Sequence, residues 1–245
     1  MEPIYVQDHI VDDVLADRFG RLKPSAILML IQEASGHHSE LLRVGYDSLA
    51  AQDLFWAISR HRVQITRLPR IGEKLRVETW PMPSTRVAYP RSVVCYDEDG
   101  QECFRSVSLW ILMDRNSRAM IVPQKSGIVV DGTLRGTELT IPKSLMPAKS
   151  RNLGRRTVCY TDLDRNGHMN NTRCMDWISD LLPSSFHRDH SIKELTTCYL
   201  TEAREGEALE LHWDFLQDDI AQVDAYRRED PEHPVRVFSV RIQFN

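Results

Sequence analysis

The chain has 245 residues, a formal net charge of -4 and 27% charged residues, which fits one large or two small globular domains. This charge balance gives no reason to expect nucleic acid as a partner. No apolar run approaches the roughly 18 residues of a membrane-spanning helix, so we expect no stable membrane insertion. The acidic N-terminus, MEPIYVQDHIVDD, lacks the apolar core of a signal peptide, so we expect a cytoplasmic protein.

The first half of the chain predicts a short strand, one long helix and then a series of strands. Apolar residues at the i, i+3, i+4, i+7 spacing of a buried helix face predict a helix from about Ser25 to Leu42. Runs rich in β-branched and aromatic residues predict strands within residues 54–68, 74–81, 86–100 and 101–114. The sequence DEDG at 97–100 predicts the hairpin turn between the last two.

The second half of the chain repeats the first. DRFGRLKPSAILMLIQEA, from Asp17, aligns with DRNGHMNNTRCMDWISDL, from Asp164. The apolar helix positions coincide as well, because Ile27, Leu30, Ile31 and Ala34 fall on Cys174, Trp177, Ile178 and Leu181. The repeat predicts an α+β fold with two copies of one unit, each a long helix against an antiparallel sheet. We place the domains at 1–128 and 153–245, with the Gly- and Pro-punctuated residues 129–152 as linker.

Five cysteines are present: Cys95, Cys103, Cys159, Cys174 and Cys198. An odd number at irregular spacing argues against a disulfide framework, and no CxxC pair suggests structural zinc. We expect all five to be packed as small apolar side chains. The adjacent His37 and His38 lack an evident third ligand, so we expect no metal and no cofactor.

Residues 161–171, TDLDRNGHMNN, gather carboxylate, amide and imidazole groups just ahead of the second predicted helix. Taken singly, each has a structural explanation: Asp164 as a turn cap, like Asp17, and Asn170 or Asn171 as a helix cap. The first copy, however, reads DRFGR where the second reads DRNGH. A purely structural role predicts similar residues in both copies, so we expect one functional site, in the second copy.

The stretch DLDRNGHMNNTRCMDW resembles the acyl-acyl-carrier-protein thioesterases of plants and bacteria, whose motif is close to D-x-N-x-H-V-N-N followed by Trp. The chain matches at Asp164, Asn166, His168, Asn170, Asn171 and Trp177, with Met169 in place of Val. A Tyr-x-x-Glu pattern of the family corresponds to Tyr199 and Glu202. Plant members have Cys after this Glu, whereas this chain has Ala203, so the resemblance implies carboxylate and water chemistry. It covers most of the chain and implies two tandem hotdog domains.

The resemblance implies hydrolysis of fatty acyl-acyl carrier protein thioesters, which releases free fatty acid and terminates chain elongation. Asp164 is the candidate for activating water or attacking the carbonyl carbon directly, and Asn166 for orienting the carboxylate or the water. His168 is the candidate for positioning the thioester or moving a proton, and Glu202 for orienting water or sharing the base role.

Two further residues are candidates for substrate positioning. Gly167 would let the backbone approach the substrate, and with Asn170 at a helix entrance it would form an oxyanion site. The more apolar first copy would enclose the acyl chain, with Ile27, Ile31 and Trp56 as candidate pocket residues. Each of these three is otherwise an ordinary core residue.

Acyl carrier protein is the partner that the resemblance implies, and it is strongly acidic. Candidate docking cations are Arg151, Arg155 and Arg156 in one segment and Arg67 and Arg70 in another. We expect a monomer of tandem hotdogs or a homodimer. The alternatives are an acyl-CoA thioesterase, a non-catalytic hotdog that binds acyl thioesters, and a hotdog dehydratase.

Overall fold

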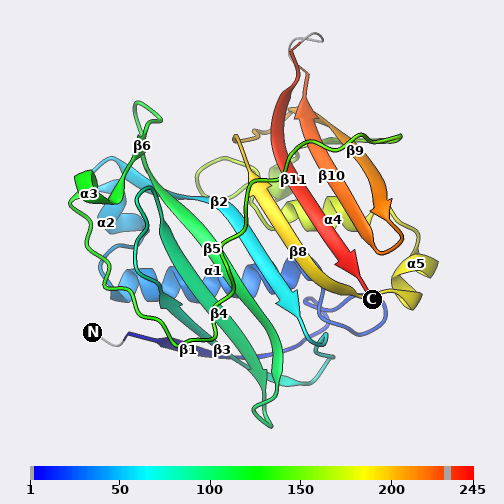
Figure 1. Ribbon diagram of the computed structural model, residues 1–245, viewed down its shortest axis with the longest axis horizontal. Coiled ribbons are helices and arrows are strands. Elements are labelled where there is room, and N and C mark those ends of the chain that lie inside the picture. Colours follow the sequence, from blue (N-terminus) through cyan, green and yellow to red (C-terminus); the bar gives the residue numbers. More distant parts are fainter. Residues whose placement is uncertain (1–2, 229–232) are drawn as a thin grey trace. The chain divides into compact units, whose positions relative to one another are not determined.

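The computed structural model describes residues 3–228 and 233–245, and the chain divides into two compact units, Met1–Pro142 and Lys143–Asn245. Each unit combines helices with an antiparallel sheet (Figure 1). The α+β class predicted from the repeat is therefore confirmed. The division falls within residues 129–152, where the sequence predicts the linker.

In the first unit, α1 crosses one face of an antiparallel sheet whose strand order is β1-β3-β4-β5-β2 (Figure 1). Its elements are β1 (Tyr5–Ile10), α1 (Pro24–Leu41), α2 (Tyr46–Ala50), β2 (Leu54–Ile65), β3 (Lys74–Pro81), β4 (Tyr89–Asp97), β5 (Glu102–Asp114), β6 (Met120–Ile121) and α3 (Pro123–Ser126). The predicted helix and the hairpin turn at residues 97–100 are both present, with the helix displaced by one residue.

The sequence of α1 explains where it begins and which face it buries. Pro24 occupies the first turn, where its missing N–H costs nothing and its fixed φ suits the helix. The buried side chains include Ile27, Ile31 and Ala34, which form the apolar face that the sequence predicts. This face packs against β3 and β1, and Met29 points away from it, with 45% of its surface exposed.

The second unit repeats this topology, with strand order β7-β9-β10-β11-β8. Its elements are β7 (Asn152–Thr157), the 3-10 turn η1 (Tyr160–Asp162), α4 (Arg173–Ser179), α5 (Ser184–Asp189), β8 (Ile192–Tyr199), β9 (Ala208–Gln217), β10 (Ile220–Arg227) and β11 (Val235–Phe244). Each strand has its counterpart in the first unit in the same order, so the internal repeat is a repeat of structure.

The expectation of one long helix in the second unit is wrong. Where the first unit has the 18 residues of α1, the second has the 7-residue α4 and the 6-residue α5. Pro183 stands between them and explains the break. Proline has no N–H to donate and disfavours helical geometry in the residue before it, so the helix ends and a new one starts at Ser184.

Residues 127–151 form no helix or strand, yet side chains hold them to each unit. In the first unit, Arg60 and Arg105 donate to the carbonyls of Pro142 and Thr137, at 2.9 and 2.7 Å. In the second, the buried Asp224 accepts a hydrogen bond from the N–H of Ala148 at 2.9 Å. The connecting segment is thus an extended strap rather than a loose linker.

Four of the cysteines are buried as predicted, but Cys159 is exposed, beside η1, so the prediction for that residue is wrong. All five are free thiols. Within the described residues, no helix has both the length and the apolar character needed to cross a membrane.

We predict that Ile31→Ala lowers the free energy of unfolding by about 2–5 kcal/mol, because a large side chain leaves a packed core. Met29→Ala, on the exposed face of the same helix, is the control and should change it by less than about 0.5 kcal/mol. Denaturant unfolding measures both. Equal small effects would mean that Ile31 borders empty space, as a pocket residue would, and would contradict its place in the core.

Candidate active site

Asp164 organises the loop that carries the polar motif. Its Oδ1 accepts hydrogen bonds from the backbone N–H groups of Asn166 and His168, at 2.8 and 3.2 Å. Gly167 closes the turn with a φ of 75°, a left-handed conformation that glycine adopts without steric cost. The carboxylate therefore fixes the backbone from which the other motif side chains project.

The first unit contains the same turn. Asp17 Oδ1 accepts from the backbone N–H groups of Phe19 and Arg21, at 2.8 and 3.0 Å, and Gly20 has a φ of 71°. Capping this turn is thus a structural task that Asp17 and Asp164 share. A chemical role of Asp164 must be additional to that task.

The turn pairs with the loop that follows the second strand of its unit. Arg21 lies opposite Arg70 in the first unit, and His168 lies opposite Arg204 in the second. The backbone frames therefore correspond residue by residue across the repeat. Two residues before the paired arginine, the first unit has Leu68.

At the position of Leu68, the second unit has Glu202, and this changes the chemistry of the site. His168 Nε2 lies 3.1 Å from Glu202 Oε2. In the first unit, by contrast, Arg21 turns back to Asp17 Oδ2 at 3.0 and 2.9 Å. The imidazole–carboxylate pair thus exists in one copy of a turn that both copies possess.

The pair is partly exposed. The side chain of His168 retains 16% of its accessible surface and that of Glu202 retains 36%. A carboxylate that accepts from one ring nitrogen fixes the orientation of an imidazole and stabilises its protonated form. The pair is therefore arranged for general acid–base work at a surface that a substrate can reach.

The backbone donors of the loop are already in use. The N–H of Gly167 donates to the Asp164 carbonyl at 3.0 Å, and that of Asn170 donates to the Asp162 carbonyl at 2.8 Å. The N–H groups of residues 166, 168 and 169 also have acceptors within the chain. The structure therefore uses Gly167 and Asn170 to hold the loop. The side-chain amide of Asn166, 3.4 Å from Asp164 Oδ2, belongs to an exposed residue and is a motif donor that solvent can reach.

The entrance to α4 is fixed from two sides. Asn170 Oδ1 accepts hydrogen bonds from both the N–H and the hydroxyl of Thr172, each at 2.9 Å, so its side chain caps the residue before the helix. From β8, the Tyr199 hydroxyl donates to the Asn171 carbonyl at 2.9 Å. Burial raises the pKa of Tyr199 well above its ordinary value, so this hydroxyl remains a donor.

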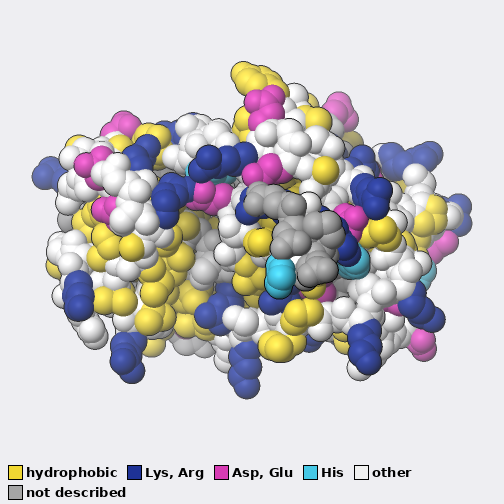
Figure 2. Space-filling model, turned by 90° about the horizontal axis from the view of Figure 1, so that it is seen from above, with side chains coloured by type: hydrophobic (Ala, Val, Ile, Leu, Met, Phe, Trp, Pro, Cys, Tyr) yellow, Lys and Arg dark blue, Asp and Glu magenta, His cyan; other side chains and the backbone are white. Residues whose placement is uncertain are grey.

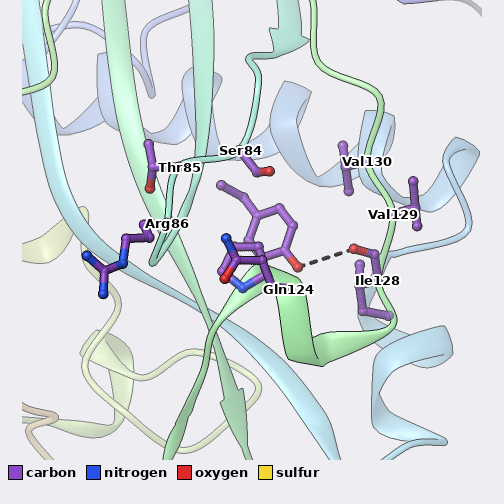
Figure 3. Close-up of a pocket in the computed structure, with 9 residues that line it drawn as sticks. Ser84, Thr85, Arg86, Gln124, Ile128, Val129 and Val130 are labelled. Carbon is purple, nitrogen blue, oxygen red and sulfur yellow. Dashed lines mark hydrogen bonds between the residues drawn. The ribbon is translucent and has the colours of Figure 1, made fainter.

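The first unit contains a cavity of about 380 Å³ between the β3–β4 connection and the segment after α3 (Figure 3). Ser84 and Thr85 line one side and Val129 and Val130 the other. The Tyr89 hydroxyl lies 3.3 Å from the Ile128 carbonyl, which it donates to (Figure 3). The lining is mixed, because Arg86 and Gln124 contribute polar groups as well as the hydroxyl residues, while Ile128, Val129 and Val130 are apolar.

The three candidate pocket residues fall in two places. Trp56 lies near the cavity: its ring meets that of Tyr89 edge-to-face, 4.8 Å between centroids, and its Nε1 donates to the Val44 carbonyl. Ile27 and Ile31 are buried under α1, with 0% and 1% exposure, and neither lines this cavity. The structure thus brings Trp56, but not the two isoleucines, close to a described cavity.

Two family models match the chain: the acyl-ACP thioesterase N-terminal domain over residues 4–125 and the acyl-ACP thioesterase C-terminal domain over residues 147–239. The chain belongs to the acyl-ACP thioesterase family. The resemblance identified from the motif residues is confirmed.

Curated members of this family are distant relatives. Oleoyl-acyl carrier protein thioesterase 1, chloroplastic, of Arabidopsis thaliana is 22% identical over 75% of this chain and 56% of its own length. Dodecanoyl-[acyl-carrier-protein] hydrolase, chloroplastic, of Cinnamomum camphora is 26% identical over 72% of this chain and 50% of its own length. The chain spans about half the length of the curated relatives it matches.

Solved structures cover the whole chain. An acyl-ACP thioesterase from Bacteroides thetaiotaomicron VPI-5482 has a TM-score of 0.87 at 21% identity and covers 99% of this chain and 98% of its own. The 12:0-ACP thioesterase from Umbellularia californica has a TM-score of 0.84 at 19% identity, and the match covers 100% of this chain and 98% of that protein's chain. These likenesses confirm the predicted fold of two tandem hotdog domains.

No group of His, Cys, Asp and Glu in the described part of this acyl-ACP thioesterase family member is suited to hold a metal ion. His37 and His38 do not share a site: His37 Nδ1 contacts Gln7 Oε1, whereas His38 Nδ1 accepts from Arg91, both at 3.0 Å. Both rings also lie against Tyr5, with centroid distances of 6.2 and 5.9 Å, but their ring nitrogens have different partners.

Sequence reasoning did not find the spent backbone donors or the role of Thr172. Thr172 stands at the N-cap position of α4, but its side chain makes no capping hydrogen bond and donates to Asn170 Oδ1 instead, so the usual capping signal does not predict its role. The acceptors of the loop N–H groups were not predictable either, because they come from Ala203 and from turns that only the folded loop creates.

We predict that Asp17→Ala and Asp164→Ala each lower the free energy of unfolding by about 1–3 kcal/mol, because each leaves backbone N–H groups without their charged acceptor. Thermal or denaturant unfolding measures both. Asp180→Ala is the control, since it removes an exposed partner of Arg156 and should cost about 0–1 kcal/mol. A wild-type stability for Asp164→Ala beside a destabilised Asp17→Ala would show that the second carboxylate does not cap its turn.

Proposed function

We propose that this protein hydrolyses fatty acyl-acyl carrier protein thioesters and releases free fatty acid. The observation that carries the proposal is the contact of 3.1 Å between His168 and Glu202, in one of two otherwise equivalent turns. Membership of the acyl-ACP thioesterase family and the names of the curated relatives support the substrate class.

In the proposed reaction, a water molecule attacks the thioester carbonyl carbon while His168 takes up its proton. Glu202 holds the imidazole and stabilises the charge that forms. The carbon–sulfur bond then breaks, and the proton returns to the leaving thiolate. The products are the fatty acid and the carrier thiol, so atoms and charge balance without a cofactor.

Asp164 and Asn166 act around this pair. Asp164 keeps the turn in the shape that directs His168 towards Glu202, through its hydrogen bonds to the backbone N–H groups of Asn166 and His168. The side-chain amide of Asn166 is our candidate for donating to the carbonyl oxygen as charge develops on it, a contact worth about 3 kcal/mol in other acyl-transfer enzymes. Gly167 and Asn170 maintain the loop on which these groups stand.

A cysteine nucleophile does not fit the arrangement. Ala203 follows Glu202 and is 3% exposed. Cys174 and Cys198 are buried, and burial raises the pKa of Cys174 to about 12, which keeps it a thiol at neutral pH. The exposed Cys159 lies before the motif, on the other side of η1.

We further propose that the first domain, 1–128 in our division, encloses the acyl chain, while the second, 153–245, carries the chemistry. Support comes from the cavity, whose lining includes Ile128, Val129 and Val130, and from the aromatic contact of Trp56 with Tyr89. A cytoplasmic location stays a prediction of the sequence, as does the choice between monomer and homodimer.

The docking site for an acidic carrier stays a proposal, with the segments 151–156 and Arg67 with Arg70 as the candidates from the sequence. The segment 151–156 offers cations that are already paired: Arg151 with Asp214, Arg155 with Glu210 and Arg156 with Asp180. On the face shown in Figure 2, Lys and Arg side chains are dispersed among acidic ones rather than gathered. The exposed Arg204, opposite His168 in the loop pairing, is a better-placed docking cation.

The test is thiol release from acyl carrier protein loaded with saturated chains of graded length. We predict that His168→Asn and Glu202→Gln each lower kcat by about a hundredfold or more, because each removes half of the acid–base pair. The control is His187→Asn in α5, where the ring contacts the carbonyl of Ser179 at the end of α4, and it should keep wild-type turnover.

Three outcomes separate the hypotheses. Thiol release from acyl carrier protein substrates that depends on both residues supports the proposal. Faster release from acyl-CoA favours the acyl-CoA thioesterase. Acyl binding without thiol release from either carrier means that the protein is a binder and overturns the proposal.

A further inference from the structure

A row of buried polar side chains crosses the interior of the first unit. His61 on β2, Ser108 on β5 and Arg91 on β4 lie side by side, because His61 pairs with Ser108 and Ser108 with Arg91. Their exposures are 3%, 0% and 6%. Directly opposed residues of antiparallel strands project to the same face. That face is the one covered by α1, since His38 of α1 meets Arg91 there.

Arg91 is a buried cation without an acidic partner. Its Nη1 donates to His38 Nδ1 at 3.0 Å and to Thr79 Oγ1 at 3.2 Å, and both acceptors are uncharged atoms. Burial lowers the pKa of Arg91 to about 10, so the guanidinium still carries its charge at neutral pH. Among the residues that the structure describes, no carboxylate pairs with it. An uncompensated buried charge opposes folding.

Two neighbours have unused hydrogen-bonding capacity. In the described part of the chain, neither His61 Nε2 nor Ser106 Oγ has a hydrogen-bond partner, although both atoms are buried. Burial lowers the pKa of His61 to about 3, so its ring is neutral at physiological pH. Ser106 stands two residues from Ser108 on β5, on the same face. Buried polar groups in folded proteins nearly always have partners, so a cluster of exceptions points to an absent ligand.

The polar row lies directly beside the aromatic part of the same interior face. Two residues along the strands, on the same face, Tyr89 on β4 is opposite Trp110 on β5, and the ring of Trp56 on β2 packs edge-to-face against Tyr89. Tyr89 also lines the cavity of Figure 3. Two residues of a strand span about 7 Å, so an acyl chain that contacts the aromatic residues lies within about 7 Å of the row formed by His61, Ser108 and Arg91.

We propose that His61, Arg91 and Ser106 form a subsite for an oxygen atom carried by the acyl chain, as a hydroxyl, oxo or carboxyl group. The inference rests on the proposed function, in which the first unit encloses that chain. The shared chemistry is an oxygen acceptor: it takes a hydrogen bond from the guanidinium and engages the imidazole and the serine hydroxyl. A carboxyl group would in addition neutralise the buried charge.

An unsubstituted chain leaves these groups unpaired, and a site built around hydrogen bonds rejects analogues that lack the matching group by large factors. Oxygenated chains should therefore be preferred over plain chains of the same length. The ratio of kcat/KM should be about tenfold or more for at least one position of the oxygen.

The experiment compares dodecanoyl thioesters with their 3-oxo, 3-hydroxy, mid-chain hydroxy, terminal hydroxy and terminal carboxy derivatives. Non-hydrolysable thioether analogues of the same chains are tested for binding by calorimetry. Ser106→Ala should reduce the preference for the oxygenated chain at least about threefold, and Arg91→Met should abolish it while leaving plain chains as good or better substrates.

Ser92→Ala is the matched control, because Ser92 is a buried serine on β4 whose pairing with Val107 puts it on the opposite face. It should leave the preference unchanged. If Arg91→Met does not fold, Arg91→Lys replaces it; it keeps the charge, loses the planar donors and should still reduce the preference.

Two results would overturn the subsite. The first is that neither assay shows a preference for any oxygenated chain. The second is that the preference remains both in Ser106→Ala and in Arg91→Met (or in Arg91→Lys, where Arg91→Met does not fold). The two assays separate this inference from the proposed function. Analogue binding that depends on Arg91, without hydrolysis of any thioester, would support the subsite and reject the hydrolase.

Discussion

The turn capped by an aspartate is the constraint on which both units depend. One carboxylate oxygen accepts hydrogen bonds from two backbone N–H groups. A glycine with positive φ then turns the chain towards the loop that follows the second strand of the unit. The carboxylate is a charged acceptor, so each of these hydrogen bonds is stronger than one between neutral groups. The residue after the glycine is thereby held against the neighbouring loop, and its side chain is positioned before any substrate arrives.

The two copies show how one backbone arrangement takes on two roles. In the first, the Arg21 guanidinium donates to the capping Asp17, and the neighbouring loop has Leu68 where the second copy has a carboxylate. Arg21 and Asp17 therefore stabilise the turn. In the second, His168 meets Glu202 instead. The change from a closed ion pair to an imidazole–carboxylate pair needs no change in the backbone. This explains why a duplicated fold carries a single candidate active site.

The interior of the first unit has diverged in another direction. Its sheet keeps the strand order of the second unit, but on the face towards α1 the buried guanidinium of Arg91 stands near His61 and Ser106, each with a buried polar atom that has no partner in the described part of the chain. Such atoms are not confined to this unit, since Thr197 Oγ1 on β8 is another. Polar groups of this kind reduce stability unless something pairs with them. The place of Arg91, His61 and Ser106 beside Tyr89, which lines the cavity, is the basis for proposing that they act in substrate selection.

Much of the fold was predictable because it depends on local patterns. The helix from Pro24 and the internal repeat follow from apolar periodicity, and the break at Pro183 was readable from the proline itself. The polar row was not predictable. A β-bulge between Ile58 and Arg60 shifts the alternation of β2, and so it is His61 that faces the interior. The exposure of Cys159 and the pairing of His168 with Glu202 likewise depend on long-range register that no single stretch encodes.

In the proposed mechanism, Asp164 shapes the turn, and His168 together with Glu202 activates water. The most direct test is turnover of Asp164→Asn beside Asp164→Ala on a loaded acyl carrier protein. The asparagine retains an oxygen that accepts the two backbone hydrogen bonds, so we expect it to keep kcat within about tenfold of wild type, while the alanine loses about a hundredfold. A folded Asp164→Asn variant as inactive as the alanine variant would contradict the account and make Asp164 the base or the nucleophile.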